Sequence, residues 1–390
     1  MSPWKWAAVA VGCAMAAWSD PGAASLGIYH WGGRYPASIS EGADAIVALG
    51  GRVARVTVSP RADLDYHTGG GCHPNFSLTR AVQEPDLQRT LENPGLDVLI
   101  LTAYDGTTWG DCGRLNFLDP DFFTPERTAA VVREYSDFSL HLYRAFQGTH
   151  KRFLISNWES DNSVYCGQAY TFATNPVFRE TCRAQYFASY GIRSPGEALR
   201  GLKLWFNARA QGIAEGRQRA LAEGLGGLRV YHAPEFNIVR ALREQGLPSA
   251  LYDVLPAVMF DYVSYSSWES INMPDPVAAL WADLDRIRDA IGSTAIVVGE
   301  AGYSRRDFSK GDDVTHLSRF LAAAQAWGVP YVIHWQLYDT DSENTFGLYD
   351  LRGQPTLLRD WFQLRFQQLN QLSLPDPLVR PVSRSPLVRE

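Results

Sequence analysis

Two glutamates follow strongly apolar runs of the sequence. Glu159 ends the stretch FLISNWE, and Glu300 ends the stretch IVVGE. A carboxyl group beside buried surface has a raised pKa, whereas hydrogen bonds from its neighbours can keep a second carboxyl group ionised. Cleavage of a glycosidic bond commonly needs such a pair, one as acid and one as nucleophile or base. We therefore expect Glu159 and Glu300 to be catalytic.

Aromatic and polar side chains follow the other apolar runs in the same way. Aromatic rings pack on the C–H faces of sugar rings, and amides and carboxylates bind hydroxyl groups, so this composition suits a carbohydrate. The expected substrate-binding residues of this kind are Trp31, Asn157, Trp158, His232, Tyr265 and Trp335. The alternative role for Trp31 and Trp335 is ordinary packing inside the barrel. The alternative for His232 is a hydrogen-bonded position at the rim. Asp161 and Glu235 are rival carboxylates for the acid.

The elements that position these residues alternate along the chain. Helical spacing is seen over 128–143, 199–225, 277–291 and 357–372. Short β-branched runs, typical of buried parallel strands, lie between such segments at Leu26–Tyr29, Val53–Val58, Val98–Leu101, Phe153–Ser156, Leu228–Tyr231, Tyr262–Ser264, Ala295–Val298 and Tyr331–His334. This count predicts an α/β fold, a (β/α)8 TIM barrel, in which the site lies at the carboxyl ends of the strands. An open nucleotide-binding sheet is disfavoured because no GxGxxG follows the first strand.

The ends of the chain differ in composition from the middle. One lysine precedes an apolar run over 7–18 that is too short to span a bilayer, and small residues follow near Ala24. We expect 1–24 to be a secretory signal, 25–372 a single catalytic domain and 373–390 a Pro-rich flexible tail. The protein would then be exported, either periplasmic or secreted. Lipoprotein anchoring through Cys13 is the weaker alternative.

Four cysteines remain after such a signal is removed: Cys72, Cys112, Cys166 and Cys182. Three pairings are possible, and an even number in an exported chain favours disulfides over a metal site. Proximity along the chain favours Cys166–Cys182, which leaves Cys72–Cys112. Both bridges would brace long loops on the catalytic face.

The charge and the motifs exclude several classes of function. A net charge of −6 without a basic run gives no positively charged segment for binding nucleic acid. An uncharged carbohydrate is the expected partner. The 8 histidines lie without metal-ligand spacing, so we expect no metal and no cofactor. A serine hydrolase is disfavoured because the sequence contains no GxSxG.

The ordered set of motifs resembles glycoside hydrolase clan A, the retaining glycosidases built on (β/α)8 barrels. The resemblance implies that Glu159 in NWES is the acid/base after strand four and that Glu300 in VVGEAGYS is the nucleophile after strand seven. It also implies that Arg55 and Tyr265 keep Glu300 ionised. Trp335 would form the floor of the subsite at the cleaved bond. In the clan, Asn directly precedes the acid/base, whereas here Trp158 separates Asn157 from Glu159.

The function implied is retaining hydrolysis of a β-linked glycosidic bond in an oligo- or polysaccharide. The alternative is a catalytically inactive carbohydrate-binding protein on the same barrel. Such a protein would keep the aromatic residues but misplace one of the two carboxylates. A metal-dependent deacetylase or phosphodiesterase would instead need a convergent cluster of His and Asp.

Overall fold

The structure is a computed structural model that describes residues 25–372, apart from 33–34, 36, 74, 110–113 and 310. The predicted signal over 1–24 and the predicted tail over 373–390 lie outside the described residues. Within those residues, no helix is long and apolar enough to cross a membrane.

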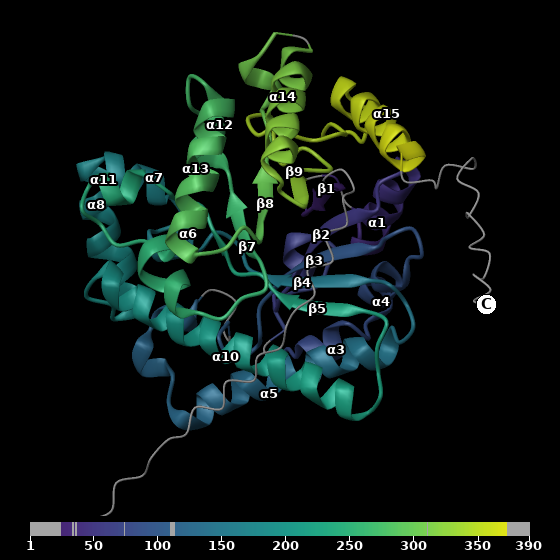
Figure 1. Ribbon diagram of the computed structural model, residues 1–390. Helices are drawn as coiled ribbons and strands as arrows, with labels where there is room; N and C mark the ends of the chain where they lie inside the picture. The colour runs from purple at the N-terminus through teal and green to yellow at the C-terminus, as the bar shows by residue number, and fades with distance from the viewer. Residues whose placement is uncertain are drawn as a thin grey trace, which may run out of the picture.

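All the strands belong to one parallel sheet, which curls around on itself (Figure 1). Hydrogen-bonded neighbours follow the order β5-β4-β3-β2-β1-β9-β8-β7-β6. The strands are β1 (Ser25–His30), β2 (Val53–Val58), β3 (Val98–Ala103), β4 (Arg152–Ser156), β5 (Arg229–His232), β6 (Glu235–Phe236), β7 (Val263–Ser266), β8 (Ile296–Ala301) and β9 (Tyr331–Trp335).

The two ends of that order are joined through one stretch of chain. β5 pairs with β4 and β6 pairs with β7, yet only Ala233 and Pro234 separate them. The N–H of Ala233 still donates to Ile155 O at 2.9 Å, and Pro234 O accepts from the N–H of Ser264 at 2.9 Å. β5 and β6 are therefore the two halves of one interrupted strand, and the fold is an α/β barrel.

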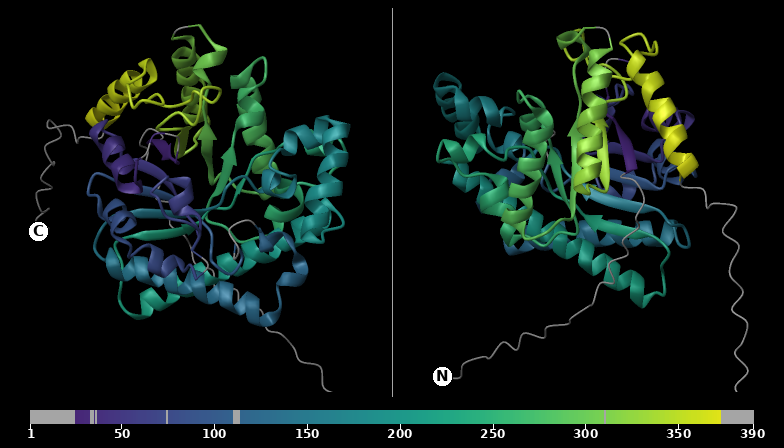
Figure 2. Two further views of the ribbon diagram at one scale, coloured as in Figure 1. Left: turned by 180° about the vertical axis from the view of Figure 1, so that it is seen from behind. Right: turned by 45° about the horizontal axis from the view of Figure 1, so that its top comes forward.

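Helices surround the strands on the outside, as both further views show (Figure 2). The longest, α5 and α10, run side by side against one flank of the sheet. The helices are α1 (Ile39–Ala48), α2 (Ala62–Asp65), α3 (Leu78–Ala81), α4 (Pro85–Glu92), α5 (Pro125–Ala145), α6 (Ser160–Val164), α7 (Ala169–Thr174), α8 (Pro176–Cys182), α9 (Ala188–Tyr190), α10 (Pro195–Ala222), α11 (Ala241–Glu244), α12 (Trp268–Ile271), α13 (Pro276–Ile291), α14 (Asp312–Trp327) and α15 (Leu357–Leu372).

The long helices begin at sequence signals for helix starts. Proline stands at the first position of α5, α10 and α13, where its missing N–H costs no hydrogen bond. The residue before each proline caps a free backbone N–H: Thr124 for α5, Ser194 for α10 and Asp275 for α13.

Alternation along the strands divides the core into two layers. Residues such as Tyr29, Ile100, Leu154 and Ile333 form a small cluster inside the barrel. Their neighbours point outward into a much larger apolar cluster beneath the helices. Because successive strand residues face opposite sides, each residue at a strand end faces either the interior or the helices.

The element predictions are confirmed with small shifts at their ends. Each predicted strand overlaps an observed one, and the four predicted helices correspond to α5, α10, α13 and α15. The sequence did not reveal β6, because a proline interrupts the fifth strand before it.

The cysteine predictions have different outcomes. Cys166 and Cys182 form the predicted disulfide, with a Cα–Cα distance of 6.0 Å. The segment that they close is largely helical, since α7 and α8 occupy most of it, rather than the long loop that we expected. Cys72 is also disulfide-bonded, but Cys112 lies outside the described residues, so that pairing stays a prediction.

Candidate active site

Both predicted catalytic glutamates lie at the carboxyl end of the barrel, and both are buried. Glu300 is in β8, and Glu159 precedes α6, just after β4. Their exposed fractions are only 2% for Glu300 and 3% for Glu159. The hydroxyl of Ser266, at the end of β7, lowers the pKa of both carboxyl groups, although neither contact has the geometry of a regular hydrogen bond. The strand ends therefore bring the two carboxylates around one hydroxyl.

Three buried polar atoms at this place make no regular hydrogen bond in the described chain: Glu159 Oε1, Glu300 Oε1 and Ser266 Oγ. Buried polar atoms are nearly always hydrogen-bonded, and exceptions often mark functional sites. Atoms of this kind are available to a bound ligand.

Glu159 is held as the proton-carrying member of the pair. Burial raises the pKa of Glu159 well above its usual value, and repulsion from Glu300 and Glu235 raises it further. Its Oε2 accepts a short hydrogen bond from Asn162 Nδ2. A raised pKa favours the protonated form of the carboxyl group, which is the form that can donate a proton.

Glu300 is closer to ionisation than Glu159. Burial raises the pKa of Glu300 to about 7, although the positive charge of Arg55 opposes this. Arg55 Nη1 lies 3.4 Å from Glu300 Oε1. The indole Nε1 of Trp268 donates to Oε2 at 3.2 Å. Because both contacts stabilise the carboxylate, Glu300 is the first of the pair to lose its proton.

Trp268 is a residue of the site that the sequence prediction missed. It is the first residue of α12, just after β7, and its indole N–H donates to Glu300. The signal was present in the segment YSSWES, because this tryptophan follows a strand end. We favoured Tyr265 instead, since the resemblance pointed to a tyrosine there.

Arg55 on β2 contacts Glu300, but its principal partner is Glu235. Both members of this pair have completely buried side chains. The guanidinium forms two hydrogen bonds to the Glu235 carboxylate, at 2.6 and 2.8 Å. It also stacks over the ring of Tyr29, at 4.4 Å from the centroid.

Of the two rival carboxylates, Asp161 supports the backbone rather than the site. It accepts hydrogen bonds from the N–H groups of Ala250, Asn237 and Ile238, at 2.8 to 3.3 Å. Burial raises the pKa of Asp161 to about 6. Because its oxygens are occupied by backbone donors, Asp161 has no free position for a substrate.

Asn157 is also hydrogen-bonded within the chain, and its predicted contact with substrate stays a prediction. Its Oδ1 accepts from the N–H of Glu235 at 3.0 Å, and its Nδ2 donates to Glu235 O at 3.1 Å and to Ser160 Oγ at 3.1 Å. The side chain is 1% exposed. Asn157 therefore fastens the end of β4 to β6.

His232 and Tyr265 make their hydrogen bonds away from the two carboxylates, so the structure does not bring them to this pair and their substrate contacts stay predictions. His232 Nδ1 bonds to Met259 O at 2.8 Å, and burial lowers its pKa well below the usual value. Tyr265 donates to Asp283 Oδ2 at 3.2 Å, in the layer under the helices. In β7, alternation turns Ser266 inward and therefore Tyr265 outward.

The three predicted tryptophans lie at or just after the carboxyl ends of β1, β4 and β9. Trp31 and Trp335 join the inner cluster, with ring centroids 5.6 Å apart, and both are only partly buried. Trp335 also packs edge-on against Tyr29. Trp158 packs instead on the edge of the outer cluster, and its backbone N–H donates to Tyr104 Oη at 2.9 Å.

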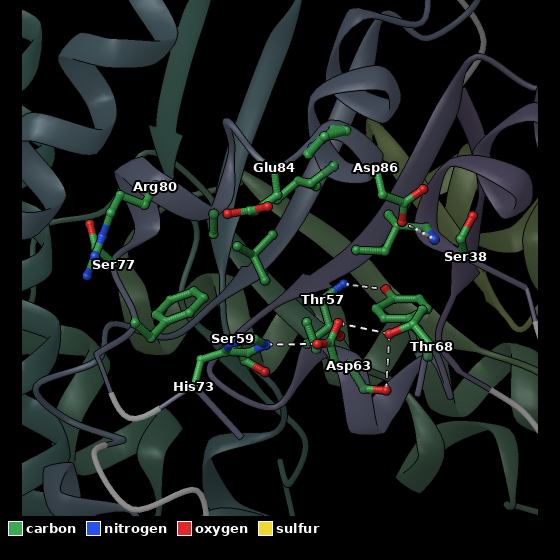
Figure 3. A pocket seen from close by; sticks show the side chains of 18 of the residues that line it. Ser38, Thr57, Ser59, Asp63, Thr68, His73, Ser77, Arg80, Glu84 and Asp86 are labelled. Atoms are coloured by element: carbon green, nitrogen blue, oxygen red, sulfur yellow. Dashed lines mark hydrogen bonds and ion pairs between the residues drawn. The ribbon is translucent and has the colours of Figure 1, made fainter. Parts of the chain in front are cut away.

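A pocket of about 570 Å³ opens beside the end of β2, between α1, α3 and α4 (Figure 3). Its walls combine apolar surface with several charged groups, including the hydrogen-bonded pair Asp63 and His73. Neither Glu159 nor Glu300 lines it. Among the residues that the structure describes, no group of 3 or more His, Cys, Asp or Glu side chains could hold a metal ion.

Comparison with known proteins gives a likeness of fold. No protein-family model and no curated protein matches the chain. A solved GH5_18 structure from Bifidobacterium longum subsp. infantis matches with a TM-score of 0.55 and 14% identity, over 89% of this chain and 79% of that one. The chain has the fold of a glycoside hydrolase barrel. The fold expected from the resemblance to clan A is thereby confirmed.

Two further structures match at similar levels. A beta-glucosidase from Thermotoga maritima in complex with deoxynojirimycin has a TM-score of 0.55 and 12% identity, over 91% of this chain and 99% of that one. An exo-beta-1,4-mannosidase from Opitutaceae bacterium strain TAV5 has a TM-score of 0.52 and 14% identity, over 91% of this chain and 61% of that one.

Proposed function

We propose that this protein is a retaining glycoside hydrolase that cleaves a β-linked bond of an oligo- or polysaccharide. The observation that carries the proposal is the pair of buried carboxyl groups at the ends of β4 and β8. Each of them has one oxygen without a regular hydrogen bond. Their pKa values are both raised, and that of Glu159 is raised more. Two carboxyl groups with separated pKa values can serve as acid and nucleophile.

The mechanism follows from this division of roles. Glu159 transfers its proton to the glycosidic oxygen while a carboxylate oxygen of Glu300 attacks the anomeric carbon. The bond to the departing sugar breaks, and an ester between Glu300 and the remaining sugar forms. Glu159, now ionised, takes a proton from a water molecule that attacks the same carbon and releases Glu300.

The surroundings of Glu300 suit a nucleophile. Arg55 and Trp268 stabilise the carboxylate form that must attack. The partly buried rings of Trp31 and Trp335 would pack on a sugar at the mouth of the barrel. The names of the solved neighbours suggest β-mannosides and β-glucosides as first substrates. We further propose that the protein is exported and meets its carbohydrate outside the cytoplasm.

The experiment that tests this proposal follows the anomeric configuration of the first product. The purified protein is incubated with aryl β-mannosides, aryl β-glucosides and β-1,4-linked oligosaccharides, and hydrolysis is monitored by proton NMR. We expect the β-anomer to appear first and to mutarotate later. Initial release of the α-anomer would contradict the double displacement. Binding without any hydrolysis would favour the carbohydrate-binding alternative.

A further inference from the structure

Glu235 is a third buried carboxylate, and the proposed mechanism assigns it no role. It belongs to β6, the short second half of the interrupted strand, and its side chain is completely buried. Removing a charge from water is costly, so a charge in this position needs compensating partners. The partners of Glu235 all belong to the immediate surroundings of Glu159 and Glu300.

Four donors converge on the Glu235 carboxylate. Oε2 accepts from Arg55 Nη1 at 2.6 Å and from Ser264 Oγ at 2.7 Å. Oε1 accepts from Arg55 Nη2 at 2.8 Å and from the backbone N–H of Glu159 at 3.3 Å. One side chain thus binds both the arginine that contacts Glu300 and the backbone of Glu159.

Close packing against β8 fixes the same carboxylate from another side. Gly299 directly precedes Glu300, and a Cβ added there would lie 2.2 Å from Glu235 Oε2 and 2.1 Å from Ser264 Oγ. Glycine at position 299 therefore lets Glu235 approach the strand that carries Glu300. Arg55 Nη1 also donates to Gly299 O at 3.0 Å, so the ion pair is attached to the backbone of β8.

We propose that Glu235 is a positioning residue, which holds Arg55 against β8 and takes the larger share of its charge. The proposal rests on the function proposed above. Arg55 Nη1 lies 2.6 Å from Glu235 but 3.4 Å from Glu300. Glu300 consequently receives only part of the stabilisation that a full ion pair would give.

The charge balance around Glu300 gives this arrangement a measurable consequence. The charged or titratable groups that act on it are Arg55 from β2, Glu235 from β6, Glu159 after β4 and Tyr29 from β1. The neutral side chains of Trp268 and Ser266 act on it as well. Arg55 lowers the pKa of Glu300, and Glu235 raises it. Neutralising Glu235 would remove the repulsion and free Arg55, and both effects favour the ionised form of Glu300.

The test measures the titration of the Glu300 carboxyl carbon by NMR in protein labelled with ¹³C at the glutamate carboxyl groups. The signal is assigned by its absence from Glu300→Gln. In Glu235→Gln we expect the midpoint to fall by about one pH unit or more, since an ion pair at short range shifts a carboxyl pKa by about 1–3 units. An unchanged or raised midpoint would overturn the proposal. This readout requires no substrate, so it does not depend on the proposed activity.

A second variant protects the test against failure to fold, because a buried ion pair that loses one partner is strongly destabilised. Glu235→Asp keeps the charge but shortens its reach by one carbon. We expect the midpoint of Glu300 to fall in this variant also, but by less than in Glu235→Gln. A midpoint equal to that of the wild type would count against the proposal.

The matched control is Asp283→Asn on α13. Asp283 is likewise completely buried and ion-paired, to Arg240 Nη2 at 3.2 Å and Arg286 Nη1 at 3.0 Å. It lies in the outer layer, next to Tyr265 rather than Glu300. We expect this variant to be less stable but to leave the Glu300 midpoint in place. An equal shift in Asp283→Asn would reduce the role of Glu235 to general support of the fold and overturn the proposal.

Discussion

The indole of Trp268 donates a hydrogen bond to the carboxylate of Glu300, with 3.2 Å between Nε1 and Oε2. The two residues come from consecutive strand ends, since α12 begins with Trp268 after β7 and Glu300 belongs to β8. The indole also meets the ring of Phe346 edge-on, with ring centroids 5.5 Å apart. Trp268 is thus fixed between an aromatic neighbour and the proposed nucleophile.

The first prediction concerns Trp268→Phe, which keeps the aromatic contact but removes the donor. A hydrogen bond to a charged group contributes about 1.5–3 kcal/mol, and this one lowers the pKa of Glu300. Its loss should raise that pKa by about one unit or more. The acid limb of the kcat/KM profile should then move to higher pH. In the control Trp281→Phe, whose Nε1 bonds to Ala323 O on α14, the limb should stay in place.

The second prediction concerns Glu159→Gln and the leaving group. An amide cannot protonate the departing oxygen, so kcat should fall by about 10²–10⁴ for ordinary glycosides. Substrates with a strongly acidic phenol as leaving group need little protonation, so the rate of their first step, in which the sugar is transferred to Glu300, should fall much less. Added azide should then form a β-glycosyl azide, because it attacks without a general base. Equal losses for all leaving groups would exclude Glu159 as the acid.

The third prediction concerns stability and pH. In the unfolded chain Glu300 titrates near 4.5, whereas its pKa in the folded protein is about 7. Between these values the folded state binds more protons than the unfolded state, so stability falls as pH rises. Glu300→Gln removes this loss, so the free energy of unfolding of the variant should exceed that of the wild type by about 3 kcal/mol at pH 8. Urea unfolding should show the difference vanishing near pH 4; a difference independent of pH would contradict the assignment.

The fourth prediction concerns the bridge between Cys166 and Cys182, which are separated by 16 positions. Closing a loop of this length stabilises a protein by about 3 kcal/mol in the chain-entropy account. The double variant Cys166→Ala/Cys182→Ala should lose roughly that free energy of unfolding. Because the bridge contacts neither carboxylate, the pH profile of activity should be unchanged. Thiol titration of the unreduced wild type should find neither residue free.

The elements and the two principal carboxylates could be predicted because they depend on local patterns. An apolar run such as IVVG specifies a buried strand, and Glu300 follows it directly in the sequence. The resemblance also implied that Arg55 acts on Glu300, and Arg55 Nη1 lies 3.4 Å from Glu300 Oε1. A charged residue in the middle of an apolar strand must find a buried partner, and within a barrel that partner lies on the inside.

The positions of Tyr265 and His232 could not be predicted, because the direction of these side chains depends on tertiary packing. In YVSYSSW either the serines or the larger residues can face the interior. The structure turns Val263 and Tyr265 toward the thick apolar layer under the helices, and it turns Ser264 and Ser266 toward the buried charges. Ion pairs such as Arg55 and Glu235 cross the barrel and leave no pattern in the local sequence.

The most direct measurement of the central claim is the identity of the residue that becomes covalently attached to sugar. The protein is incubated with a 2-deoxy-2-fluoro glycoside that has an activated leaving group, and the labelled peptide is sequenced by mass spectrometry. We predict one sugar per chain, attached to Glu300, and no label on Glu300→Gln. A label on Glu159, Asp161 or Glu235 in the wild type would contradict the account.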